Sequence, residues 1–205
     1  MDQRRRLLGS EKGWLVLKRH LYRGFSLVEL MVVIAILAMF MLYAVPGMTD
    51  YMTSAKIRNS AQALQAGLMK ARGEAIRTNR PIEFFTTDAS PPLLNSVAND
   101  TGSNWVIADR TRPALQGGPA LVESRDAREG SATQVTQTTN QNTITFNPIG
   151  GTDLIANAVF DFAHPSTTCT AASAVRCMRV VVNPSGRVHL CDPLITGATD
   201  PRRCA

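Results

Sequence analysis

The chain has 205 residues, of which 44% are hydrophobic and 19% are charged, and its formal net charge is +6. This length allows one modest domain and an anchor, and it excludes an array of large domains. Of the 22 basic and 16 acidic residues, seven and two lie in residues 1–24, which leaves 15 and 14 for residues 25–205. The positive charge therefore gives no argument for nucleic-acid binding, and residues 1–24 instead fit a signal that keeps the N-terminus in the cytoplasm.

Residues 25–45 are predominantly apolar, and Glu29 is their only charged residue. A helix of this length rises roughly 30 Å, the thickness of the hydrocarbon core of a bilayer. We therefore predict a transmembrane helix over residues 25–45. A carboxylate near the start of such a helix is costly in lipid, so its presence predicts a function for Glu29.

A second helical pattern extends over residues 46–80. It begins at Pro46 and Gly47, which predict a kink or a loosened turn. Apolar residues then recur at three- and four-residue intervals, which predicts one buried face and a solvated basic face opposite. The residues expected on the buried face are Ala55, Leu64, Leu68, Ala71, Ala75 and Ile76. Asn79, Arg80 and Pro81 are expected to end the helix.

Residues 81–205 have the pattern of a β-rich domain. Short strands are expected at 82–85, 104–109, 121–123, 143–146, 158–162, 178–182 and 187–191. Residues 86–104 are expected to form a loop, and residues 130–141 a connector. Because an amphipathic helix must bury its apolar face and antiparallel sheet is the partner that this chain offers, the fold class is predicted to be α+β.

Four cysteines lie close together near the C-terminus, namely Cys169, Cys177, Cys191 and Cys204. No histidine stands at a metal-ligand spacing from them, so we expect disulfides and no metal site. Three pairings are possible, and Cys169 with Cys177 and Cys191 with Cys204 is favoured because each pair closes a short loop. An oxidising compartment outside the cytoplasm also favours two disulfides.

No catalytic constellation is evident in the sequence. His20, His164 and His189 are isolated, and none has partners spaced as in a catalytic triad. We therefore expect no enzyme activity and no cofactor. A membrane-anchored enzyme with a dispersed polar site is the remote alternative.

The segment Gly24-Phe25-Ser26-Leu27-Val28-Glu29-Leu30 resembles the processing site of type IV prepilins and pseudopilins. The resemblance implies that prepilin peptidase cuts after Gly24, removes the leader 1–24 and methylates the new amine of Phe25. It also implies that Phe25, Glu29 and Pro46 act in filament assembly, with Glu29 meeting the N-terminal amine of a neighbouring subunit. Two alternatives are an ordinary signal anchor and a Glu29 that pairs only with its own amine.

Two further stretches resemble FimT and GspH proteins, namely residues 71–79 and the segments Phe146-Asn147-Pro148 and Pro184-Ser185-Gly186-Arg187-Val188. Residues 86–142 carry no such resemblance. The family implies a long helix packed on antiparallel sheet, and a single-pass inner-membrane protein with a cytoplasmic N-terminus and a periplasmic domain. It also implies entry, with other pilins or pseudopilins, into a helical filament. The two candidates are a FimT-type minor pilin of the type IV pilus and a GspH-type pseudopilin of type II secretion.

A basic C-terminal region favours the pilus candidate. Gly186-Arg187-Val188-His189 resembles the Gly-Arg-x-Arg motif by which FimT-type minor pilins bind DNA, and it departs from that motif at His189. The resemblance implies weak binding of double-stranded DNA by Gly186, Arg187 and His189, with Arg202 and Arg203 as added contacts and the helix arginines Arg72 and Arg77 uninvolved. Histidine is charged only in mildly acidic solution, so its contact depends on pH. The alternative is a sheet edge with ordinary solubilising arginines.

Overall fold

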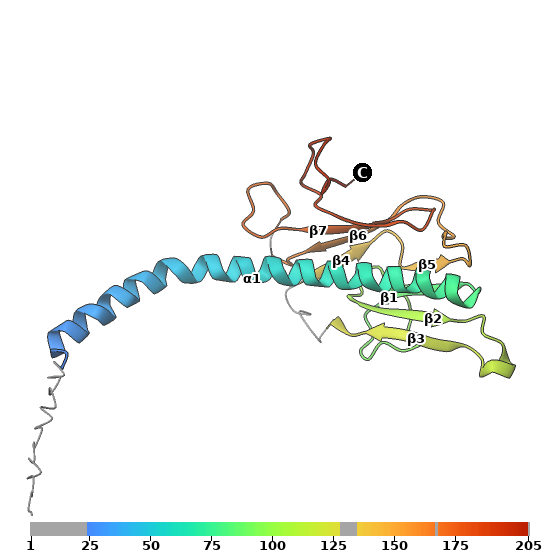
Figure 1. Ribbon diagram of the computed structural model, residues 1–205, viewed down its shortest axis with the longest axis horizontal. Helices are drawn as coiled ribbons and strands as arrows, with labels where there is room; N and C mark the ends of the chain where they lie inside the picture. The colour runs from blue at the N-terminus through green and yellow to red at the C-terminus, as the bar shows by residue number, and fades with distance from the viewer. Residues whose placement is uncertain (1–23, 128–134, 167, 205) are drawn as a thin grey trace, which may run out of the picture. The chain divides into compact units, whose positions relative to one another are not determined.

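The computed structural model describes residues 24–127, 135–166 and 168–204, with the backbone alone at residues 42–47 (Figure 1). The chain divides into two compact units between Tyr43 and Ala44. In its described part, the first unit consists of the start of helix α1 (Leu27–Thr78). The second unit contains the rest of α1 and the strands.

The described strands of the second unit form two antiparallel sheets of four strands each. Sheet A has the order β3-β2-β1-β5, with β1 (Ile82–Thr87), β2 (Asn104–Asp109), β3 (Ala120–Arg125) and β5 (Thr143–Phe146). Sheet B has the order β4-β6-β7-β8, with β4 (Thr136–Thr139), β6 (Ala158–Ala163), β7 (Met178–Val182) and β8 (Val188–Cys191). A 3₁₀ helix, η1 (Ala114–Gln116), lies between β2 and β3. The predicted α+β class is confirmed.

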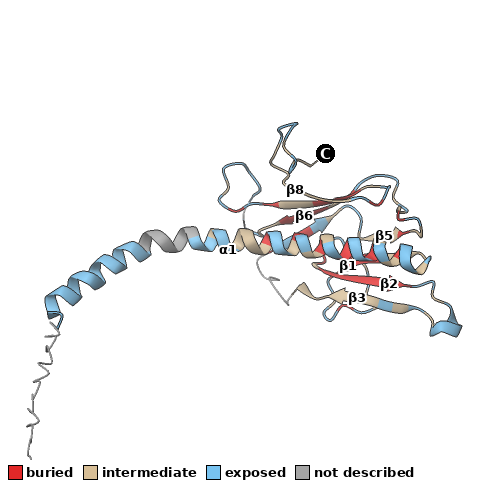
Figure 2. Cartoon of the chain, in the orientation of Figure 1, coloured by how far each residue is buried: buried red, intermediate tan, exposed pale blue. Residues whose placement is uncertain are grey.

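One face of α1 packs against both sheets and forms the core of the second unit. In Figure 1, β6 and β7 lie on one side of the helix and β1, β2 and β3 on the other. Phe84 of sheet A meets Phe160 of sheet B edge to face, with 6.5 Å between the ring centroids, and stacks on Trp105 at 5.7 Å. The buried residues therefore lie along the helix and the strands that flank it (Figure 2). On α1 they are Ile57, Ala61, Leu64, Gly67, Leu68, Ala71 and Ala75.

The predicted buried face is wrong at one position. Ile76 is 52% exposed, because one residue beyond Ala75 the helix has turned by about 100° away from the sheets. Ile57 and Ala61, which lie on the buried stripe between Ala55 and Leu64, were absent from the prediction. The fully buried stripe therefore runs from Ile57 to Ala75, and Ala55 is only partly buried.

Helix α1 ends where the sequence predicts. Asn79 has a φ of 52°, and the backbone N–H of Arg80 donates to the carbonyl of Ala75 at 3.3 Å. This is the left-handed cap with a six-to-one hydrogen bond that commonly stops helices, and asparagine is one of the few residues that adopt it. The cap turns the chain directly into β1.

The predicted connector is wrong over residues 136–139, which form β4. Strand β4 pairs with β6, and Gln137 points inward with an exposed fraction of 2%. The threonines that made this segment resemble a loop are β-branched and suit a strand with one exposed face. Residues 130–134 of that prediction lie outside the described residues.

The loop before β2 covers the far face of sheet A. Phe85, Val106 and Ala108 form a small second cluster, and Leu94 and Ala98 of the loop pack on it. The backbone N–H of Asn99 donates to the Thr86 carbonyl at 2.8 Å, and the Thr86 hydroxyl donates to the Asn99 carbonyl at 2.7 Å. A segment that bore no family resemblance is thus bonded to the sheet.

Within the part of the chain that the structure describes, no helix is both long and apolar enough to cross a membrane. The predicted span 25–45 includes residues 42–45, whose side chains lie outside the described part. The transmembrane helix stays a prediction.

Truncation of the α1 stripe tests this packing. Leu64→Ala should lower the free energy of unfolding by about 2–5 kcal/mol, because it leaves a cavity between the two sheets. Ile76→Ala, predicted as core from sequence alone, should cost less than about 1 kcal/mol. Thermal unfolding of the detergent-solubilised chain, followed by near-ultraviolet circular dichroism, compares the two. Equal losses would contradict the assignment of Ile76 to the surface.

Candidate functional site

The start of α1 is capped by the residue that follows Phe25. The hydroxyl oxygen of Ser26 accepts a hydrogen bond from the backbone N–H of Glu29 at 3.2 Å, and the Ser26 carbonyl accepts from the Leu30 N–H at 3.1 Å. Serine is a preferred N-cap residue because it satisfies one of the N–H groups that a helix start leaves unpaired. Gly24 and Phe25 precede the helix and are exposed. The predicted cleavage site therefore lies in non-helical backbone.

Glu29 lies in the first turn of α1 on an otherwise apolar surface. Apolar side chains from Leu27 to Met41 are about half to three-quarters exposed in this single chain. A helix that is hydrophobic on all sides needs other helices or lipid around it. Helices or lipid that cover this surface would also remove Glu29 from water. A carboxylate removed from water needs a cation beside it.

The residues predicted to bind DNA are only partly brought together. Arg187 and His189 line the same open hollow of about 140 Å³, together with Asn157, Val181 and Asn183. Since residues two apart on a strand share a face, this hollow belongs to the surface of sheet B that faces away from α1. The imidazole Nε2 of His189 lies 3.3 Å from the Arg203 carbonyl oxygen.

The C-terminal segment is fixed against β8 by a disulfide and a hydrogen bond. The structure links Cys191 to Cys204 and Cys169 to Cys177, the pairing that the sequence favours. The Asp192 N–H donates to the Arg202 carbonyl at 2.8 Å. Arg203 is thereby held beside His189.

Arg202 already has a carboxylate partner. Its guanidinium donates two hydrogen bonds to Asp200, at 3.1 Å and 2.9 Å, and its backbone N–H donates a third at 2.9 Å. These bonds hold the pKa of the Asp200 carboxyl below its usual range, and they raise the pKa of Arg202. Arg179 likewise pairs with Asp161. The positive surface near Arg187 is therefore weaker than the arginine count indicates.

Gly186 and Gly150 lie in two matching turns of sequence Asn-Pro-x-Gly. In each, the glycine N–H donates to the asparagine carbonyl, at 2.9 Å for Gly150 and 2.8 Å for Gly186. In each, the asparagine side-chain oxygen also accepts from the next N–H, that of Gly151 or Arg187, at 2.9 Å. The φ angles of the two glycines are 87° and 78°.

The two turns are pressed together. A Cβ on Gly186 would collide with the Gly150 carbonyl oxygen, and the Thr152 N–H donates to the Pro184 carbonyl at 3.0 Å. Glycine is therefore required at residue 186 by both backbone angle and space. This turn fixes the position of Arg187 directly before β8.

Arg72 is the neighbour of these turns that the sequence missed. Its Nε would lie 3.1 Å from a Cβ on Gly150 and 3.4 Å from one on Gly186, and within the described part of the chain this buried atom has no hydrogen-bond partner. Arg72 therefore contacts the turn that precedes Arg187, although the sequence interpretation placed it on a solvated face. No local pattern could reveal this contact, because it joins residues more than 70 positions apart.

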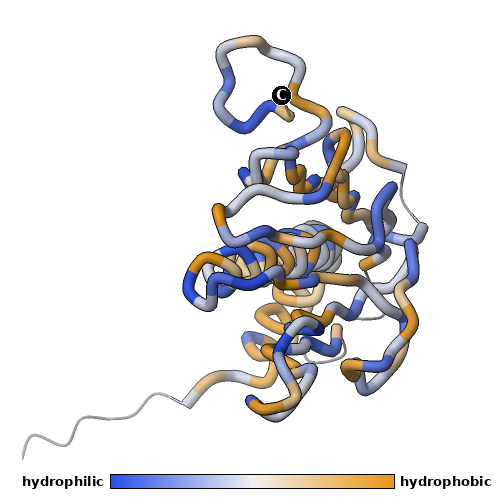
Figure 3. Tube along the Cα trace, turned by 90° about the vertical axis from the view of Figure 1, so that its right-hand side faces the viewer, coloured by the Kyte–Doolittle hydropathy of each residue, from blue (hydrophilic) through white to orange (hydrophobic). Residues whose placement is uncertain are grey.

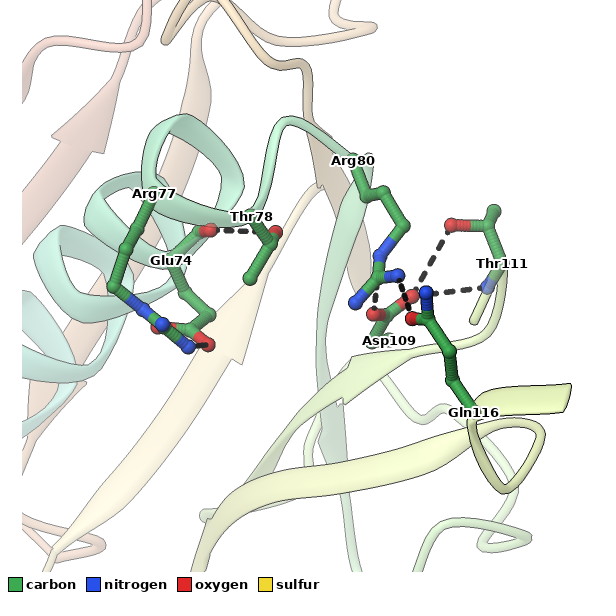
Figure 4. A network of polar contacts seen from close by, with 7 residues as sticks. All are labelled: Glu74, Arg77, Thr78, Arg80, Asp109, Thr111 and Gln116. Atoms are coloured by element: carbon green, nitrogen blue, oxygen red, sulfur yellow. Dashed lines mark hydrogen bonds and ion pairs between the residues drawn. The ribbon is translucent and has the colours of Figure 1, made fainter. Parts of the chain in front are cut away.

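A second polar cluster lies at the end of α1, as Figure 4 shows. Arg77 pairs with Glu74 on the helix, and Arg80 pairs with Asp109 at 3.0 Å and donates to Gln116 at 2.7 Å. Hydrogen bonds from Arg77 lower the pKa of Glu74. Arg80 thereby joins the end of β2, through Asp109, and η1, through Gln116, to the end of the helix. Each of the two arginines has an acid beside it. Figure 3 views this end of the second unit, where exposed turns carry hydrophobic as well as hydrophilic residues.

The described residues hold no group of three or more histidine, cysteine or acidic residues that could bind a metal ion. The Nδ1 of His164 accepts from the Ser166 N–H at 3.2 Å, which places it in a local turn. His20 lies outside the described residues.

Two family models match the chain. Residues 60–186 match the family described as type II transport protein GspH. The chain belongs to this family. Residues 19–45 match the prokaryotic N-terminal methylation motif, which includes Gly24 and Glu29. The protein is thus a minor pilin or pseudopilin, of the type IV pilus or type II secretion kind.

Two solved structures of type IV minor pilin FimU from Pseudomonas aeruginosa, strain PAO1, are similar to this GspH-family chain. In space group P2₁ the identity is 19%, with a TM-score of 0.48, 66% of this chain covered and 88% of that chain. In space group P6₅ the identity is 19%, with a TM-score of 0.45 and coverages of 65% and 90%. No curated protein gives a significant match to the sequence.

The Asp200–Arg202 pair gives a testable pH dependence. Because the folded pKa of Asp200 is depressed, its stabilising contribution is present above the unfolded pKa and is lost as the pH falls through the folded pKa. In an NMR titration, Arg202→Gln should move the Asp200 carboxyl to a higher pKa, toward that of an unpaired aspartate. Arg203→Gln serves as the control and should leave it in place. An unchanged titration in Arg202→Gln would show that Arg202 is available to other anions.

Proposed function

We propose that this protein is a filament subunit of the minor pilin type, cleaved after Gly24, methylated on Phe25 and anchored in the inner membrane before assembly. The observation that carries the proposal is the capped helix start. Ser26 begins the helix two residues after the scissile bond, and it places Glu29 in the first turn. Cleavage would create an amine within one helical turn of that carboxylate.

The charge balance at this helix start favours pairing between subunits. The first turn of a helix is electropositive, and a new amine adds a further positive charge beside it. Glu29 offsets both in a single chain. In a filament, apolar helices pack side by side, and the neighbour's amine is the cation that Glu29 meets when water is removed. Glu29 can pair with the amine of its own chain before assembly and with the amine of a neighbouring chain afterwards.

Replacement of Glu29 tests the assembly step. Glu29→Ala should be inserted and cleaved but should enter filaments at a small fraction of the wild-type level, because an uncompensated amine would be buried. Mass spectrometry should find residues 1–24 absent and Phe25 methylated in both proteins. Gly24→Ala is the processing control and should retain residues 1–24. Normal incorporation of Glu29→Ala would remove Glu29 from the assembly mechanism.

A second element of the proposal is weak binding of double-stranded DNA in the type IV pilus. The support is the hollow on the outer face of sheet B, where Arg187 and His189 lie side by side and Arg203 is held next to them. The guanidinium of Arg187 has no ion pair among the described residues. Arg202 contributes little, since Asp200 neutralises it. About two phosphates can be met at neutral pH.

The alternative within the same family is a structural pseudopilin of type II secretion. The family match over residues 60–186 favours it, and the pairing of Arg179 and Arg202 with acids weakens the case for DNA. The genes beside this one distinguish the two, because pilus-assembly and secretion machines are encoded with their own components.

A DNA titration tests the second element. The affinity should be weak and independent of sequence, and log K should fall against log salt with a slope near −2, at roughly 0.9 per phosphate contact. Arg187→Gln should weaken binding to every sequence, and mild acidification should strengthen it as the imidazole of His189 gains a proton. Arg112→Gln, an exchange of the same charge at the far end of sheet A, is the matched control. If no binding occurs at low salt, or if both variants bind alike, a purely structural subunit remains.

A further inference from the structure

A groove runs between α1 and the edge strand of sheet A. Ala63, Gly67 and Lys70 of α1 form one wall, and Glu123, Ser124 and Arg125 of β3 form the other. The indole of Trp105 lies between the walls, and the open volume is about 370 Å³. We refer to this feature as the α1–β3 groove.

Ala63 and Gly67 of the helix wall are small, and they leave room beside the indole of Trp105. A Cβ on Gly67 would lie 3.0 Å from the Trp105 ring, so that even alanine would press on the indole. Trp105 is itself held by stacking on Phe84. The groove is therefore shaped by the packing of the core beneath it, and it does not depend on a flexible surface loop.

One hydrogen-bond donor at the groove and one donor beside it lack acceptors among the described residues. The guanidinium of Arg125 has no ion pair or hydrogen bond among the described residues, whereas Lys70 across the groove pairs with Glu123. A narrower hollow of about 30 Å³ adjoins the groove at Trp105 and Arg125, and Gln137 lines it. Gln137 is 2% exposed, and its side-chain nitrogen has no hydrogen-bond partner among the described residues. A buried donor without an acceptor costs free energy, so an occupant rich in acceptor oxygens would stabilise the site.

The β3 wall offers a second set of unpaired groups. In sheet A, β3 pairs with β2 on one side and lies at the edge on the other. An edge strand presents a row of backbone N–H and C=O groups, and proteins use such rows to add an extended segment of a partner. Backbone acceptors and an open side-chain groove thus meet along the same strand.

We propose that an extended segment of a partner subunit adds to the β3 edge and places a carboxylate on Arg125. This proposal rests on the protein's being a filament subunit. The helix of a second copy would fit the small residues Ala63 and Gly67, but its backbone acceptors are used within the helix. It would therefore leave the backbone groups at the edge of β3 without partners. A strand with an aspartate or glutamate supplies oxygens to both the edge and the groove.

Photo-crosslinking in assembled filaments tests the proposal. A photoreactive amino acid is incorporated at Ser124 of the full-length chain, in cells that carry the filament machinery, and the linked peptides are sequenced by mass spectrometry. We expect linkage to a non-helical segment of another subunit with an acidic residue within a few positions. Arg125→Glu should lower the yield about fivefold, because it reverses one partly exposed ion pair. Exchange of the partner's acidic residue for arginine should restore the yield.

Controls separate this proposal from the proposed function. The same photoreactive residue at Ile36, on the apolar part of α1, reports assembly alone. Linkage at Ile36 without linkage at Ser124 overturns the groove proposal and leaves the filament subunit intact. Absence of both overturns the proposed function as well. Linkage of Ser124 to α1 of a second copy, or an equal loss of yield in Arg112→Glu, also overturns the strand-addition proposal.

Discussion

The second unit depends on one apolar stripe of α1 that is shared by two sheets. Leu64 and Leu68 are fully buried, and burial of each such side chain contributes about 1.5–3 kcal/mol. The edge-to-face contact of Phe84 with Phe160 then joins the sheets beneath the helix. In the described part of the chain each sheet has four short strands, and neither could cover its apolar face without the helix.

This arrangement confines polar functions to the periphery. The interior beneath α1 is filled by aromatic and aliphatic side chains, so the described residues offer open hollows at strand edges and turns. The two Asn-Pro-x-Gly turns show how such a peripheral position is fixed. Gly150 and Gly186 touch because neither has a side chain, and Arg72 packs against both. The packing of Arg72 and of the two turns thereby fixes the backbone directly before Arg187.

Local patterns predicted much of the fold and of the processing site. Alternating residues identified strands such as β6 and β7, and short loops indicated the disulfide partners. The pattern failed where the decisive contact is distant in sequence. Gln137 is polar but buried between strands, and Arg72 lies beneath turns that follow it by more than 70 residues. The pairing of Arg202 with Asp200 is local, yet the sequence does not reveal it, because a sum of charges does not say which side chains are bonded to each other.

The two parts of α1 differ in how their apolar side chains are distributed around the helix, and the position of each charge follows from this. From Ile57 to Ala75 the stripe occupies one face, so basic residues can stay in water on the other. From Leu27 to Met41 the side chains are apolar on every side, so no solvated face is available for a charge. Glu29 is tolerable there because it lies in the first turn, where the exposed N–H groups of the helix favour a carboxylate, and the amine that the proposed cleavage would create would favour it further. A glutamate one or two turns later would lie far from both the N–H groups of the helix start and the N-terminal amine.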